Sequence, residues 1–303
     1  MKKSLLLTCF LVAAPGLADA EMSVFACEPE WASLATELGG NLLQVESATT
    51  GVQDPHYIQA RPSLISRVRR ADLVICTGAD LEAGWLPLLL RQGNNAKVQA
   101  GQPGFFAASD YVNMLEKPQV LDRAQGDIHP FGNPHIQTDP RNIGLVAEAL
   151  NQRLQSLDPA NVATYEARYQ DFQARWSQAI DGWSARLEPL KGAKLVVYHR
   201  SWVYLFTWAS LVDVGALEPK PGVPPSSSYL SELLARLKDQ QVLGIIQSSY
   251  QPTRPAEWLS ERTGLPILIL PHTVGSVSGV TDLFSMFEVL VSELEAAAAG
   301  SAK

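Results

Sequence analysis

The chain has 303 residues, of which 46% are hydrophobic and 18% are charged, and its formal net charge is −7. This length and composition predict a globular protein of two domains, and the negative charge argues against nucleic acid as a partner. No run of about 18 apolar residues follows the N-terminal region, so we expect no membrane-spanning helix.

The N-terminus has the pattern of a secretory signal peptide. Lys2 and Lys3 precede the apolar residues 5–17, and small residues at 18 and 20 form a cleavage motif. Cys9 lies inside the apolar segment, too early to be the lipid anchor of a lipoprotein. We therefore expect the mature protein to begin after residue 20 and to reside in the periplasm.

Strand-like and helix-like segments alternate after the signal. The apolar runs predict strands at residues 23–26, 42–47 and 73–76, and the amphipathic segments predict helices at 31–38, 62–70 and 82–91. This rhythm is typical of a doubly wound parallel sheet. Cys27 and Cys76 each lie at a strand end. They form either a disulfide or two buried free thiols, and the sequence leaves both alternatives open.

Residues 158–189 predict one long amphipathic helix. Asp158 is a good N-cap, and apolar side chains then recur every three or four positions up to Leu187. About 30 residues at 1.5 Å each give roughly 45 Å, long enough to run along two domains. The strand–helix rhythm restarts after this helix, so the expected fold class is α/β, with two doubly wound parallel-sheet lobes joined by one long α-helix. The expected segments are 1–20 (signal peptide), 21–157 (N-terminal lobe), 158–189 (linking helix) and 190–303 (C-terminal lobe).

The five histidines lie on constrained backbone. His199 ends an apolar run that predicts a buried strand, and a side chain at the carboxyl end of such a strand faces the ligand crevice of an open α/β sheet. The other four each adjoin a proline, which stiffens the backbone: His56, His129, His135 and His272. We interpret this pattern as a preorganised metal site.

Zinc binds about four nitrogen, sulfur or oxygen ligands, and four residues lie where chain segments should converge. His56 follows the second strand, and His135 precedes a helix that starts near Asp139. His199 ends the first strand of the second lobe, and Asp282 begins the last helix. Each lobe thus contributes two candidate ligands to a cleft between the lobes.

These segments resemble those of the zinc- and manganese-binding solute-binding proteins of ABC transporters. The resemblance rests on Asp54-Pro55-His56 before a Pro-Ser helix, on Asn133-Pro134-His135 with the following residues to Asn142, on Tyr198-His199, and on Thr281-Asp282. It implies that His56, His135, His199 and Asp282 bind the metal. Manganese binders of the family tend to have a carboxylate at the third position, so His199 favours Zn²⁺, with manganese or another divalent metal as the alternative.

The resemblance also implies a function. It predicts a periplasmic, monomeric, high-affinity zinc-binding receptor, not an enzyme, which delivers Zn²⁺ to a membrane ABC permease and for which a periplasmic metallochaperone is a candidate donor. Metal ligands must be deprotonated, so binding is expected to weaken as the pH falls through the histidine range.

Some residues depart from the family pattern. His129 is the one histidine in a segment where many zinc binders have a long histidine-rich loop, and it is either an auxiliary ligand or a structural residue. His272 is the runner-up to Asp282. For both histidines we favour the structural interpretation. Glu28 and Glu30 follow the first strand, where they could accept hydrogen bonds from ligands.

Three other functions compete with this one on the same residues. A zinc hydrolase would leave Asp282 out of the site and use Glu28 or Glu30 as a base, but the sequence has no His-Glu-x-x-His motif. A surface adhesin is disfavoured because the signal lacks a lipid-anchor cysteine. A siderophore or haem receptor would lack convergent histidines.

Overall fold

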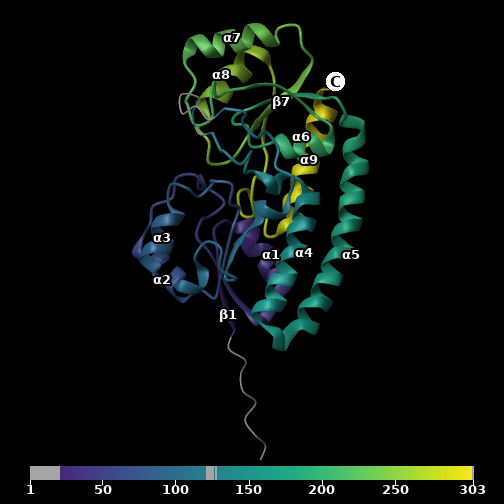
Figure 1. Ribbon diagram of the computed structural model, residues 1–303. Coiled ribbons are helices and arrows are strands. Elements are labelled where there is room, and N and C mark those ends of the chain that lie inside the picture. Colours follow the sequence, from purple (N-terminus) through teal and green to yellow (C-terminus); the bar gives the residue numbers. More distant parts are fainter. Residues whose placement is uncertain (1–20, 121–125, 127, 302–303) are drawn as a thin grey trace, which may run out of the picture.

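The computed structural model of the chain describes residues 21–120, 126 and 128–301 (Figure 1). The expected signal peptide lies outside them. Two four-stranded sheets form the centres of two lobes, in the strand orders β2-β1-β3-β4 and β6-β5-β7-β8. All six strand pairings are parallel. This confirms the prediction of two doubly wound α/β lobes.

The elements alternate along the chain as the hydrophobic pattern predicts. The strands are β1 Met22–Ala26, β2 Leu43–Ser47, β3 Leu73–Cys76, β4 Phe105–Ala107, β5 Lys194–Val197, β6 Val212–Ala216, β7 Val242–Gln247 and β8 Ile267–Ile269. The α-helices are α1 Pro29–Gly39, α2 Pro62–Arg70, α3 Leu86–Gly93, α4 Pro140–Leu157, α5 Val162–Leu187, α6 Val203–Ala209, α7 Ser227–Leu237, α8 Arg254–Thr263 and α9 Leu283–Ser301. Within the described part of the chain, no helix is long and apolar enough to cross a membrane.

The helix α3 begins later than the sequence predicts. The expected start was Glu82, but the helix begins at Leu86, after a turn in which Ala79 and Asp80 have positive φ angles. Glu82 accepts hydrogen bonds from the backbone N–H groups of Thr77 (2.8 Å) and Gly78 (3.1 and 3.2 Å). These bonds fold the segment back on the end of β3, so the carboxylate stabilises a turn in place of a first helical turn.

A disulfide joins Cys27, directly after β1, to Cys76, the last residue of β3. The two Cα atoms are 4.7 Å apart, as neighbouring strand ends allow. Of the two alternatives that the sequence leaves open, the structure contains the disulfide.

Helix α5 runs beside both lobes (Figure 1). Its 26 residues span about 39 Å. Near its middle Arg175 forms an ion pair with Glu37 of α1, and near its end Arg186 binds Glu288 and Glu295 of α9, each at 2.7 Å. The helix thus contacts elements from both ends of the chain.

The main hydrophobic core is continuous across the two lobes. Side chains of β1, α1, α4, α5, β5 and α9 form one buried cluster, while two smaller clusters cover the outer faces of the sheets. At its centre the Trp176 ring lies 4.8 Å from Phe284 and 5.6 Å from Phe287, between ring centroids. The lobes are therefore tied by shared apolar packing as well as by the chain.

Replacing Trp176 with alanine is expected to lower the free energy of unfolding by about 3–5 kcal/mol, because the change empties a buried site at the centre of the shared core. It also removes the hydrogen bond from the indole Nε1 to the Pro140 carbonyl oxygen, 2.8 Å long. Urea unfolding measures the loss. The exposed Gln178→Ala on the same helix is the control; equal losses in both variants would contradict this account of the core.

Candidate metal centre

Three histidines from three separate loops meet between the lobes. His56 lies between β2 and α2, His135 directly precedes a short 3₁₀ turn before α4, and His199 follows β5. One ring nitrogen from each lies within 4.8 Å of the other two. Three of the four predicted ligands are thus brought together, close enough for one metal ion to lie among them.

Local hydrogen bonds shape two of these loops in the same way. The backbone N–H of His56 donates to Asp54 Oδ1 (3.0 Å), and that of His135 donates to Asn133 Oδ1 (3.1 Å). Each is an Asx turn closed around a proline, a stiff local structure that needs no distant support. The repeated Asx-Pro-His sequence therefore presents an imidazole from each turn.

Carboxylates orient two of the rings. His56 Nδ1 is 2.7 Å from Asp54 Oδ1, and His199 Nδ1 is 2.7 Å from Glu218 Oε2. A carboxylate on Nδ1 keeps the proton there and leaves the Nε2 lone pair for a metal. The Nε2 atoms of His56 and His135 are buried and have no hydrogen-bond partner within the described part of the chain.

Electrostatics favour the neutral form of His135, the most deeply buried imidazole of the group. Burial first, and then the charges of His56 and His199, hold the pKa of His135 well below its ordinary value. Burial alone would raise the pKa of Asp54, but its hydrogen bond to His56 and the charge of that ring lower it overall. The site therefore offers a neutral imidazole beside an ionised carboxylate, which suits a cation.

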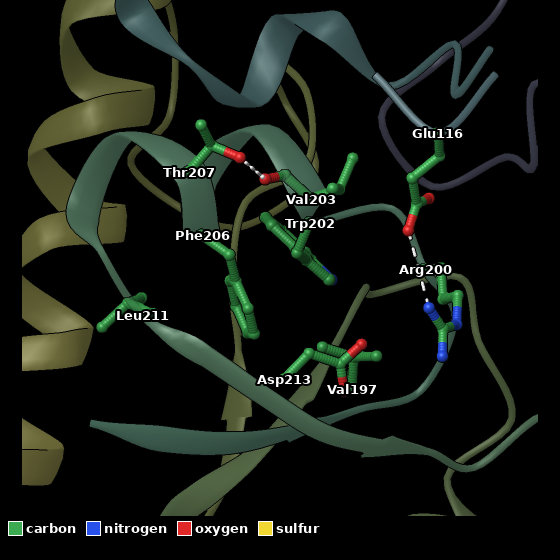
Figure 2. Close-up of a pocket in the computed structure, with 9 residues that line it drawn as sticks. All are labelled: Glu116, Val197, Arg200, Trp202, Val203, Phe206, Thr207, Leu211 and Asp213. Atoms are coloured by element: carbon green, nitrogen blue, oxygen red, sulfur yellow. Dashed lines mark hydrogen bonds and ion pairs between the residues drawn. The ribbon is translucent and has the colours of Figure 1, made fainter. Parts of the chain in front are cut away.

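A hydrogen-bond network ties the His135 loop to the His199 loop. Asn133 Nδ2 donates to Glu116 Oε2 (3.0 Å) and to the backbone oxygen of Arg200 (2.7 Å), the residue after His199. Figure 2 shows Arg200 turned toward Glu116, its ion-pair partner at 3.5 Å, on one side of a 340 Å³ surface cavity. No histidine lines that cavity. It bears on the histidine group only through the Arg200–Glu116 ion pair, which lies on its wall and helps to hold the two loops.

The His56 loop also contacts the C-terminal lobe. Gly51 lies so close to Gly275 that a Cβ on Gly51 would be 2.3 Å from the Gly275 carbonyl carbon. A side chain there would push the backbones apart, so a glycine is required for this approach. On the other side, Trp85 Nε1 donates to the Pro55 oxygen at 2.8 Å and holds the loop on its own lobe.

Asp282, the fourth predicted ligand, lies outside the group of three histidines. Its side chain is exposed and accepts hydrogen bonds from the backbone N–H (2.7 Å) and the hydroxyl (2.8 Å) of Ser285. Ser285 Oγ in turn accepts from the N–H of Asp282 at 3.0 Å. This reciprocal pair caps α9.

The two histidines assigned structural roles both lie near the group. The His129 ring centroid is 5.4 Å from that of His56. His272 is buried and lines an enclosed cavity together with His135. All five histidines therefore gather at the interface of the lobes.

Sequence reasoning missed the roles of Asp54 and Glu218. Asp54 is part of the Asp-Pro-His motif, and its place two residues before His56 is the signal for an Asx turn. Glu218 lies two residues beyond β6, the neighbour of β5 in the sheet. Since parallel neighbours end at the same edge, a carboxylate there is placed to reach His199.

Glu28 and Glu30, which we expected beside the candidate ligands, form hydrogen bonds with other residues. Glu28 Oε2 accepts from the N–H and hydroxyl of Thr77, both at 3.2 Å, and Glu30 accepts from the Thr273 hydroxyl across the lobe interface. Burial raises the pKa of Glu28 well above its ordinary value, and raises those of Glu30 and Glu82 to about 7. These carboxyl groups form a buried acidic cluster beside the β1 and β3 ends.

Comparisons with known proteins bear on this site. The family model of the zinc-uptake complex component A, periplasmic (ZnuA), matches residues 24–297. The high-affinity zinc uptake system protein ZnuA of Yersinia pestis is 25% identical over 256 residues, 80% of each chain. The metal ABC transporter substrate-binding lipoprotein SloC of Streptococcus mutans is 22% identical over 86% of this chain and 84% of its own. The iron ABC transporter substrate-binding lipoprotein MtsA of Streptococcus pyogenes is 22% identical over 87% and 83%.

Solved structures share the fold. A crystal structure of ZnuA superposes with a TM-score of 0.77 at 22% identity, covering 92% of this chain and 99% of its own. A manganese-bound periplasmic metal-binding protein from Candidatus Liberibacter asiaticus gives a TM-score of 0.73 at 16% identity, covering 91% and 99%. The relatives thus carry names that refer to different metals, and the metal must be argued from the donor atoms.

Replacing Glu218 with glutamine is expected to weaken Zn²⁺ binding by about 10–100-fold, the usual effect of removing the carboxylate behind a ligating imidazole. Competition against a chromophoric chelator measures the affinity. Glu293→Gln, an exposed change on α9, is the control. Unchanged affinity in Glu218→Gln would refute the role given to this carboxylate.

Replacing Glu30 with glutamine is expected to change how stability depends on pH. The folded-state pKa of Glu30 is about 7 against an ordinary 4.5, so the folded protein keeps a proton that the unfolded chain has released between these values. The stability that this proton contributes is complete below pH 4.5 and is lost as the pH rises toward 7. Glutamine cannot ionise, so the variant should gain on the order of 1–3 kcal/mol relative to wild type between pH 5 and pH 8.

Urea unfolding at both pH values tests the Glu30 prediction, with Glu293→Gln as the matched change at an exposed carboxylate. A difference between variant and wild type that stays constant from pH 5 to pH 8 would count against it.

Proposed function

The chain belongs to the ZnuA family, the periplasmic component A of zinc-uptake complexes, and we propose that it captures Zn²⁺ with high affinity in the periplasm and delivers it to a membrane ABC permease. The family consists of solute-binding proteins of metal ABC transporters, not enzymes. In this proposal residues 1–20 are the signal peptide, residues 21–157 and 190–303 form the two lobes, and residues 158–189 link them. The mature protein acts as a monomer, with a periplasmic metallochaperone as a candidate donor.

The observation that carries the proposal is the convergence of His56, His135 and His199 within 4.8 Å. Imidazole nitrogen suits Zn²⁺, whereas manganese prefers carboxylate and carbonyl oxygen. The carboxylates nearest the cluster, Asp54 and Glu218, are hydrogen-bonded to ring nitrogens. These carboxylates therefore favour a cation through their negative charge and by orienting the imidazole rings. The proposed contacts with the metal come from imidazole nitrogens.

The charge balance also favours a divalent cation. Neutral imidazoles leave the full +2 charge on a bound Zn²⁺. Asp54 and Glu218 lie one imidazole away from that charge, and opposite charges attract strongly at a half-buried site. Because the pKa of His135 is already low, this ligand needs no proton loss at neutral pH, and binding should persist below the ordinary histidine range as far as His135 is concerned.

Competition titration of residues 21–303 against a chromophoric chelator tests the function. We expect one tight equivalent of Zn²⁺, because one ring nitrogen from each of the three histidines lies within 4.8 Å of the other two. His199→Ala should weaken binding by more than about 100-fold, since even an indirect partner of a ligand is worth 10–100-fold, and an excess of Mn²⁺ should not compete.

The exposed Gln178→Ala variant is the control for this titration and should bind as wild type does. Absence of tight Zn²⁺ binding would refute the proposal. Tight Mn²⁺ binding at the same residues would replace Zn²⁺ by Mn²⁺ as the transported ion.

A further inference from the structure

His272 lines a small cavity between the lobes together with His135, while the ring nitrogens that lie within 4.8 Å of one another are those of His56, His135 and His199. The cavity has a volume of about 10 Å³, and its walls include His135, Gln137, Tyr250 and Glu30. A space of this size holds a single water-sized particle. It is lined from both lobes, as the histidine cluster is.

Both ring nitrogens of His272 are buried and have no hydrogen-bond partner within the described part of the chain. The residue is 5% exposed. Buried polar groups are nearly always hydrogen-bonded, so an imidazole without any partner needs an explanation. The Nε2 atoms of His56 and His135 have the same property.

The backbone around His272 is fixed against the His135 loop. Gln137, two residues after His135, donates from Nε2 to the backbone oxygen of His272 at 3.1 Å. The hydroxyl of the next residue, Thr273, donates to Glu30 of the opposite lobe. The His272 ring itself packs edge-on against Tyr250, 4.9 Å between centroids. Hydrogen bonds thus hold the backbone around His272, whereas its ring has none. The side chain can therefore rotate while the backbone stays in place.

We propose that His272, and not Asp282, supplies the fourth ligand of the metal site, which makes the centre an all-imidazole site of His56, His135, His199 and His272. This inference rests on the proposed function and deepens it. Asp282 is already engaged as the cap of α9. His272 follows β8 in the C-terminal lobe, so each lobe still contributes two ligands.

His129 is the competing imidazole. Its ring lies 5.4 Å from that of His56, but the residue is only half-buried and lines an open cavity at the rim, with Ile128 and Pro221. The Nε2 atom of His129 is buried as well, but among the five histidines of the described part of the chain only His272 has both ring nitrogens buried without a hydrogen-bond partner. These two nitrogens assign the fourth position to His272.

An all-imidazole site has a consequence for selectivity. Four neutral nitrogen donors suit the ions that bind imidazole well, such as Zn²⁺, Cu²⁺ and Ni²⁺, and disfavour Mn²⁺, which prefers oxygen. A carboxylate at position 272 would narrow that difference. The identity of this one side chain thus sets how strongly the site discriminates against Mn²⁺.

The test compares four variants of the mature protein: His272→Ala, His272→Asp, Asp282→Asn and His129→Ala. Zn²⁺ and Mn²⁺ affinities come from chelator competition, and the absorption spectrum of bound Co²⁺ reports the donor set. His272→Ala should weaken Zn²⁺ binding by at least about 10-fold, which is the lower bound for a partner of a ligand. His272→Asp should restore most of that affinity, alter the Co²⁺ spectrum and lower the ratio of Zn²⁺ to Mn²⁺ affinity at least 10-fold.

Asp282→Asn keeps a good helix cap and should bind Zn²⁺ within about threefold of wild type; His129→Ala should weaken it less than His272→Ala does. Unchanged Zn²⁺ affinity and Co²⁺ spectrum in His272→Ala, while His199→Ala abolishes tight binding, would overturn this inference and leave the proposed function standing. A loss confined to Asp282→Asn or His129→Ala would overturn it too. If wild type binds no Zn²⁺, the proposed function itself fails. Circular dichroism of each variant verifies that it is folded.

Discussion

The rest of the structure depends on a few imidazole nitrogens that are buried and have no hydrogen-bond partner. His56 and His135 hold such atoms at the interface of two lobes, within the described part of the chain. Burying a polar atom without a partner is unfavourable, so the surrounding structure must fix these rings where they are. Carboxylates on the opposite ring nitrogen, Asx turns and inter-loop hydrogen bonds do so. A cation that reaches the cluster would meet three imidazoles that the surrounding structure already holds in place.

The fold supports this arrangement by joining the lobes through a shared core. Side chains of α5 and α9 pack into one cluster with both sheets, and Arg186 adds ion pairs between the two helices. Wide opening of the cleft would expose apolar surface, at roughly 25 cal/mol for each Å². The relative position of the lobes is therefore nearly fixed, and ligands contributed by different lobes can be aligned before a metal arrives.

Periodicity and motif predicted much of this from the sequence. Apolar runs located the strands, and steps of three and four located the long helix, because backbone geometry imposes these periods. His56 and His135 could be singled out because Asx-Pro-His is a local structure. Glu218 could not, because its contact with His199 depends on which strands are neighbours. The predicted start of α3 is too early because the Glu82 carboxylate accepts a hydrogen bond from the Thr77 N–H. Helix propensity does not include such a contact. Asp282 caps α9, and a helix cap and a metal ligand have the same sequence signature at a helix start, so its assignment as a ligand stays a prediction.

A receptor must also give up its metal, and the fixed lobes restrict how. If the lobes move little, affinity must change through the loops that carry the ligands. These loops differ in their anchors. His199 lies two residues beyond a central strand, and the His135 loop is held by Asn133 to Arg200 and Glu116. The His56 loop has no strand or helix from residue 48 to residue 61 and reaches the other lobe at Gly51. Loops with few buried apolar contacts open at the lowest cost in free energy. Displacing this loop would move the His56 imidazole together with the Asp54 carboxylate, so under the proposed function a single loop movement would lower both the number of donors and the negative charge around the ion.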